Sequence, residues 1–140
     1  MPKYRYKMRL NDLFLKNSEV DSLTRHLILS GYPDDVVKAG LESFVAAWEE
    51  SAKWIRCDFP LVSDEYYYDL FQRSQLYLVL QHASPMQIAA YSTRIDQADH
   101  IFKQHTIEID APCDAFIDDI KKSEKEIHWW LFRLPKKGLS

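Results

Sequence analysis

The chain has 140 residues, 46% of them hydrophobic and 14% aromatic, which is enough for one domain with a substantial core. Three glycines and six prolines leave little scope for long flexible loops, and two cysteines, Cys57 and Cys113, exclude a disulfide-rich scaffold. The net charge of −3 is divided unevenly, because residues 1–16 carry +4, residues 133–140 carry +3 and residues 17–132 carry −10.

The N-terminal residues 1–16 form a basic segment. Residues 3–10 alternate between apolar and cationic side chains, which predicts a strand with one solvated cationic face. An extended arm lying on the helices and an overriding helix are the alternatives. The segment lacks the apolar stretch of a signal peptide, and residues 76–80 are too few to cross a bilayer. We therefore expect a cytoplasmic protein without membrane contact.

Two helices are predicted after the N-terminal segment. The first is predicted to start with Asn17 or Ser18 as N-cap and to end before Gly31. The second is predicted to run without a break over residues 34–56, because apolar residues recur at helical spacing from Val37 to Ile55. We expect this long helix to be the centre of the fold.

Three more helical segments are predicted. Ser63 is expected to cap a helix over residues 64–82, which is apolar nearly all round and should therefore be buried on more than one side. Ser84-Pro85-Met86-Gln87 predicts a capping box that starts a helix reaching His105, with Asp96, Asp99 and His100 on its outer face. A fifth segment starts at residues 110–112.

Residues 125–140 form an aromatic and basic tail, which reads as a strand more than as a helix. The predicted fold is a mainly α, single-domain bundle of about five helices over residues 1–140. Residues 17–124 would form the helical body, and short strands at the N- and C-termini would pair as a small sheet.

Part of this sequence resembles a group of small bacterial helical proteins without an established activity. The matching residues are Ser30-Gly31-Tyr32-Pro33, Val37, Gly40-Leu41, Trp48-Glu49, Glu65-Tyr66, Asp69-Leu70, Arg73, Trp129-Trp130, Arg133 and Pro135. The chain departs from the group at Tyr67, Tyr68 and Phe71, where polar residues are usual. The resemblance implies a compact bacterial helical domain and supplies no catalytic residue.

One polar group stands out within the predicted helices. Glu49, Asp69 and Arg73, with Trp48 beside them, are expected to meet between the second and third helices. Asp69 and Arg73 are one helical turn apart, so the arginine either neutralises its own helix neighbour or binds an anionic or amide-bearing ligand. We favour the structural interpretation.

No other pattern predicts a catalytic, cofactor or metal site. Asp96, Asp99 and His100 lack an obvious remote partner to complete a zinc site. Cys57 and Cys113 lie in no catalytic signature and are expected to pack in the interior.

The leading functional hypothesis is therefore a non-catalytic protein-interaction module. Its most concrete version is a protein of the inhibitor or immunity type, whose acidic body covers a basic partner. Trp129 and Trp130 would be interface anchors if either were exposed. The alternatives are an enzyme or small-ligand binder with an interhelical pocket near Trp48, Asp69 and Arg73, and nucleic-acid binding through the basic N-terminal segment. The acidic body argues against nucleic acid.

Overall fold

The computed structural model describes residues 20–57 and 61–139, and most of them are helical. The α-helices are α2 (Ser22–Leu29), α3 (Asp34–Ala39), α4 (Leu41–Ile55), α5 (Ser63–Leu80) and α6 (Pro85–Gln104). They are followed by β1 (Thr106–Glu108), three 3-10 helices η1 (Asp114–Phe116), η2 (Lys122–Glu124) and η3 (Trp129–Phe132), and β2 (Arg133–Pro135). The mainly α fold with five helices and a small sheet is confirmed.

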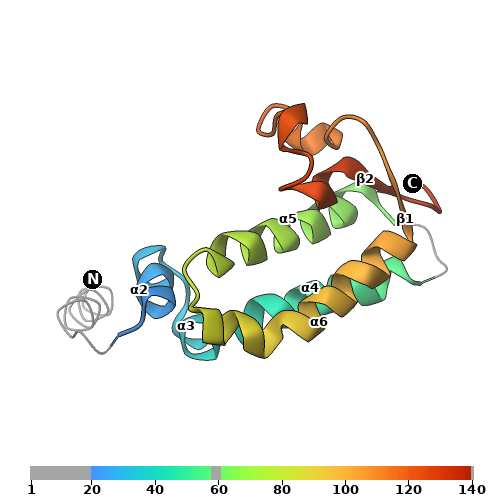
Figure 1. Cartoon of the computed structure of the whole chain (residues 1–140). Helices are drawn as coiled ribbons and strands as arrows, with labels where there is room; N and C mark the ends of the chain where they lie inside the picture. The colour runs from blue at the N-terminus through green and yellow to red at the C-terminus, as the bar shows by residue number, and fades with distance from the viewer. Residues whose placement is uncertain (1–19, 58–60, 140) are drawn as a thin grey trace, which may run out of the picture.

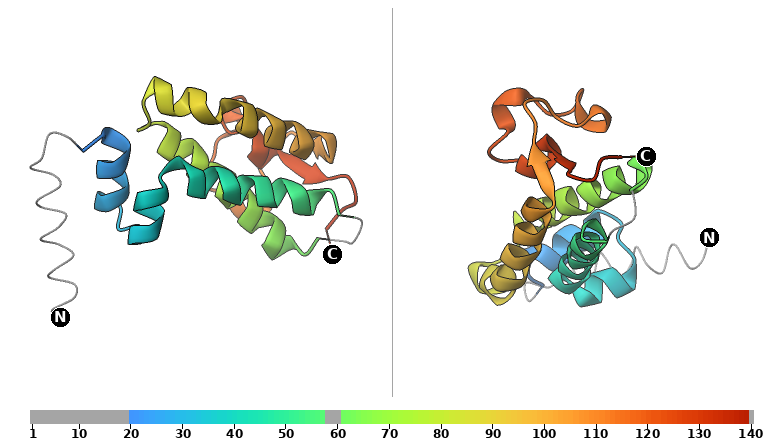
Figure 2. Two further views of the ribbon diagram at one scale, coloured as in Figure 1. Left: turned by 90° about the horizontal axis from the view of Figure 1, so that it is seen from below. Right: turned by 90° about the vertical axis from the view of Figure 1, so that its right-hand side faces the viewer.

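The three long helices form the body of the molecule (Figure 1). Helix α4 packs against both α5 and α6, while α2 and α3 gather at one end of these helices. Figure 2 shows the same arrangement from two further directions, with the C-terminal segment lying toward the other end. The basic N-terminal segment, and with it the predicted strand over residues 3–10, lies outside the described residues.

The predicted central helix over residues 34–56 is wrong, because it is two helices. Gly40 has φ +60° and ψ −133°, a backbone conformation that L side chains rarely adopt. It ends α3 and precedes the first residue of α4. The hydrophobic spacing continues across this break, so the pattern alone predicted one helix.

The predicted helix boundaries have mixed outcomes. The capping box at Ser84 is confirmed, since its Oγ accepts from the Gln87 backbone N–H and the Gln87 side chain accepts from the Ser84 N–H. Gly31, with φ +79°, follows the C-cap of α2 as predicted. Asp21 caps α2 through the Thr24 N–H at 2.7 Å, whereas the predicted cap at residues 17–18 lies outside the described range. Ser63 is not a cap but the first residue of α5.

The C-terminal third is less helical than predicted. The expected fifth helix is wrong, because residues 114–116 form only a short 3-10 turn. The tail contains a 3-10 helix through its aromatic residues and then a three-residue strand. This strand pairs antiparallel with β1, with Ile107 opposite Leu134. Among the described residues, the partner of the C-terminal strand is therefore β1.

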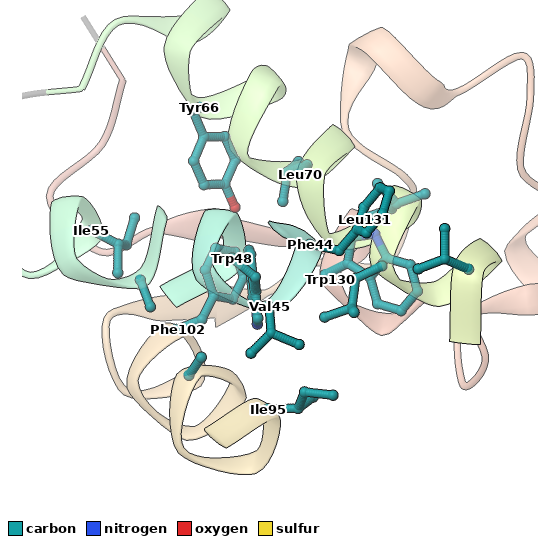
Figure 3. Close-up of a cluster of buried hydrophobic side chains, with 14 of the residues drawn as sticks. Phe44, Val45, Trp48, Ile55, Tyr66, Leu70, Ile95, Phe102, Trp130 and Leu131 are labelled. Carbon is teal, nitrogen blue, oxygen red and sulfur yellow. The ribbon is translucent and has the colours of Figure 1, made fainter. Parts of the chain in front are cut away.

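The core lies where α4, α5, α6 and η3 meet. Its largest fully buried side chains are aromatic: Trp48, Tyr66, Phe102, Trp130 and Phe132. Figure 3 shows Trp48 and Phe102 meeting between their helices, with Tyr66 reaching in from α5. The aromatic tail is thus part of the main core. Across the described ranges, no helix combines the length and the apolar character that a bilayer span requires.

Candidate functional site

Arg73 lies in the core and joins α5 to α6. Its side chain is only 9% exposed, and its Nε and Nη2 atoms donate to Asp99 Oδ1 and Oδ2 at 2.9 and 3.1 Å. The Trp48 indole N–H donates to the same Oδ1 at 2.8 Å. The predicted ion pair between Asp69 and Arg73 is therefore wrong, and so is the outer-face position predicted for Asp99. A carboxylate on the neighbouring helix is the partner of the arginine.

Three tryptophan rings surround the Arg73 guanidinium. Its Cζ atom lies 4.6 Å from the ring centroid of Trp130, 5.8 Å from that of Trp129 and 5.9 Å from that of Trp48. Its Nη1 atom is buried without a hydrogen-bond acceptor among the described residues. Attraction to the aromatic faces offsets part of the cost of burying this donor. We interpret Arg73, Asp99 and Trp48 as a structural network.

Glu49 belongs to a different ion pair. Arg94 of α6 donates from Nε to Glu49 Oε2 at 3.1 Å and also binds Glu42, so it connects two carboxylates of α4 to α6. The hydrogen bond from Arg94 lowers the pKa of Glu49, and this effect exceeds the opposing effect of burial. The predicted cluster of Glu49, Asp69 and Arg73 does not form.

Neither tryptophan of the tail is exposed. Trp130 is 1% exposed, and its indole N–H donates to Ser74 Oγ at 2.8 Å. Trp129 is half-buried, with the Lys103 ammonium 4.4 Å from its ring centroid. Both contribute to packing. The condition under which they would be interface anchors is not met.

The remaining candidate residues also have structural surroundings. Cys113 is buried, its Sγ donates to the Arg133 carbonyl at 3.2 Å, and burial raises the pKa of its thiol to about 11. Cys57 is half-buried against the Lys53 carbonyl. In residues 20–57 and 61–139, no group of three or more His, Cys, Asp or Glu side chains is placed to hold a metal ion.

A groove between α4 and α5 is the best candidate site. It has a volume of about 640 Å³. Its lining residues are Ala47, Glu50, Ser51, Trp54, Leu61, Asp64, Glu65, Tyr68, Asp69 and Gln72. We call it the acidic groove, because four of these residues are carboxylates and none is Lys, Arg or His. The volume falls in the range of ligand pockets.

Two aromatic side chains and one partly buried carboxylate give the acidic groove its chemistry. Trp54 is 45% exposed and Tyr68 is 62% exposed. Asp69 is half-buried and accepts a 2.8 Å hydrogen bond from Ser51 Oγ. Burial raises the pKa of Asp69 to about 6, the Ser51 hydrogen bond opposes this, and the charge of Glu65 adds to it. A cation near Asp69 would therefore stabilise its charged carboxylate.

Sequence reasoning identified Asp69 but missed the residues around it. Trp54 and Tyr68 lie on faces of their helices that are not part of the main core. The sequence did contain one indication of Tyr68. The pattern of α5 is apolar nearly all round, yet the fold covers only part of the surface of this helix. The pattern could not show which apolar residues the fold leaves outside.

Comparisons of the chain with protein-family models, with curated proteins and with solved structures found no match. The resemblance to small bacterial helical proteins therefore stays a prediction.

Proposed function

We propose that this protein is a non-catalytic protein-interaction module that binds a basic segment of another protein through the acidic groove. The observation that carries the proposal is the composition of the groove, in which carboxylates accompany two exposed aromatic rings and none of the described lining residues is basic. An arginine or lysine side chain matches this surface. Its alkyl stem would pack on the rings, and its charge would lie among the carboxylates.

The physical basis for affinity differs between the two kinds of groove residue. Exposed tryptophan and tyrosine are enriched among the residues that dominate binding energy at protein interfaces. The exposed carboxylates of Glu50, Asp64 and Glu65 contribute mainly to attraction at a distance and to the choice of partner. The charge of −10 on residues 17–132 acts in the same direction. Covering a basic surface of a partner is the mode of action expected of an inhibitor or immunity-type protein.

The alternative function, an enzyme or small-ligand binder with a pocket near Trp48, Asp69 and Arg73, has less support. Trp48 and Arg73 do not line the acidic groove, and both are buried in contact with Asp99. Asp69 faces a different space from these two residues. An enzyme based on the three together would need a rearrangement of the core. Nucleic-acid binding through residues 1–16 stays a prediction, because that segment lies outside the described residues.

Affinity capture with matched charge variants tests the proposal. The full chain is immobilised as wild type, as Glu65→Gln with Asp69→Asn, and as Asp118→Asn with Asp119→Asn, and each is exposed to the same lysate. The last pair removes the same charge from exposed positions outside the groove. We expect a captured protein with a basic contact segment that the groove variant loses and the control retains.

Salt provides the second readout. Capture through the acidic groove should weaken as ionic strength rises, since exposed charge pairs are screened. Absence of any capture, equal capture by the groove and control variants, or capture of a partner whose contact segment carries no basic residues would overturn the proposal.

A further inference from the structure

The outer face of α5 carries an exposed apolar stripe next to the acidic groove. Tyr68, Phe71 and Leu78 are 62%, 47% and 51% exposed, and we call these three residues the α5 stripe. They follow one another at intervals of three and seven residues, so they lie on one face of the helix. The inward face of the same helix carries the buried Leu70 and Leu76.

The spacing of the α5 stripe indicates the shape of what covers it. A narrow apolar row that repeats every three or four residues and again after seven is the pattern that packs against a single helix. Gln75, which lies between Phe71 and Leu78 in this pattern, is held by the Tyr32 hydroxyl. The row is therefore apolar at both ends and polar in the middle, a combination that favours one register of the partner helix.

The stripe and the acidic groove meet at Tyr68. Tyr68 belongs to both, and Gln72 lines the groove one position after Phe71. The acidic residues of α5 are confined to its beginning, at Asp64, Glu65 and Asp69. Along the axis of α5 the surface is thus acidic at one end and apolar toward the other.

We propose that the occupant of this surface is an amphipathic α-helix of a partner protein, with apolar side chains on the α5 stripe and lysine or arginine side chains over the acidic groove. This inference rests on the proposed function and adds the form of the partner segment. From Asp64 to Leu78 the axis of α5 measures about 21 Å, so the partner helix has about four turns. Its cations lie at the end that covers the first turns of α5.

Charge complementarity identifies the partner as basic and argues against a second copy of this body. Four of the described residues that line the acidic groove are carboxylates, so two such grooves that faced each other would repel. A basic helix removes this repulsion and places its cations beside the partly buried carboxylate of Asp69. Trp54 and Tyr68 line the same acidic groove as Asp69.

Selection from a display library of random 18-residue peptides on the immobilised full chain tests the inference. We expect enriched peptides with apolar residues at intervals of three and four and with lysine or arginine concentrated at one end. Synthetic copies should gain helical circular dichroism on binding. Enriched peptides that bind in extended form, or that lack the helical spacing, would overturn the inference.

Two pairs of variants locate the contact. Phe71→Ser with Leu78→Ser should weaken binding of the enriched peptide at least 10-fold. Ile107→Ser with Ile127→Ser, which alters exposed apolar residues of the C-terminal segment, should leave it within twofold. Equal effects of the two pairs would refute the assignment to the α5 stripe. Because all four side chains are exposed, the variants should fold like the wild type.

The groove variant separates the two proposals. If Glu65→Gln with Asp69→Asn weakens binding of the enriched peptide and Phe71→Ser with Leu78→Ser does not, the proposed function holds and the helical partner is refuted. If neither variant weakens it, or if no peptide is enriched, both are refuted. Loss of binding in both variants, with the control pair unchanged, is the result expected from the structure.

Discussion

Truncation of Arg73 should destabilise the protein far more than truncation of a comparable arginine on the surface. In Arg73→Ala, the Asp99 carboxylate, whose side chain is 17% exposed, would keep only the Trp48 N–H of its present partners. Removal of one member of a buried ion pair costs about 3–5 kcal/mol, because the other charge stays buried. Attraction between the guanidinium and the Trp130 ring contributes about 1 kcal/mol of what is lost.

The total of about 4 kcal/mol is a large fraction of the 5–15 kcal/mol by which domains are usually stable. It corresponds to a decrease in Tm of about 14 °C for a chain of this size. Arg94→Ala is the matched control, since Arg94 likewise forms ion pairs between two helices, in its case α6 and α4, but its side chain is 36% exposed. Exposed ion pairs contribute at most about 1 kcal/mol, so this control should lose little.

The assay is chemical denaturation followed by far-ultraviolet circular dichroism, because the substitution changes the surroundings of three tryptophans and therefore their fluorescence. Arg73→Ala, Asp99→Asn and the double variant complete a thermodynamic cycle, in which we expect a coupling of about 2 kcal/mol or more. A cost below about 1.5 kcal/mol for Arg73→Ala, or an equal cost for Arg94→Ala, would refute the interpretation of this network as structural.

Two further predictions concern α5. The pKa of Asp69 is raised from 3.8 to about 6 in the folded protein, so the native state binds more protons than the unfolded state between these values and stability falls as the pH rises through this range. Asp69→Asn should remove this loss and be more stable than the wild type at pH 7 by at most about 3 kcal/mol in urea denaturation, since one pKa unit corresponds to about 1.4 kcal/mol. An unchanged pH profile between pH 4 and 7 would contradict the assignment. Tyr66→Phe removes a buried hydroxyl that donates to the Arg133 carbonyl at 2.6 Å and should cost about 1–2 kcal/mol in thermal unfolding. Tyr68→Phe, which alters an exposed ring, should cost less than about 0.5 kcal/mol, and equal costs for the two tyrosines would count against the role of this hydrogen bond.

The sequence predicted the helices best where a local signal sets their ends. The capping box at Ser84 and the glycine after α2 depend on residues three or fewer positions apart, and both predictions are confirmed. Gly40 was more difficult, because the hydrophobic spacing continues across it. A glycine inside a helical pattern either stays helical or takes a positive φ, and the packing of α3 and α4 decides between the two.

The polar contacts could not be predicted from spacing. Asp69 and Arg73 are four positions apart and satisfy the rule for neighbours on a helix, yet the arginine points into the core toward Asp99. That partner lies 26 positions away and on another helix. The packing of α5 and α6 on the same helix, α4, brings the two together, and periodicity within one helix contains no information about this arrangement.

Arg133 has a further consequence, for the order in which the structure forms. Its carbonyl accepts from Tyr66, 67 positions earlier, and its guanidinium donates to the Thr106 hydroxyl and carbonyl and to the Lys103 carbonyl at the end of α6. Contacts of such sequence separation close large loops and therefore form slowly compared with helices. We expect a folding phase in which α4, α5 and α6 are already helical while Trp130 is still exposed to water. Docking of the C-terminal tail onto these helices would follow and exclude water from the core. Tryptophan fluorescence should then lag behind the recovery of helical circular dichroism.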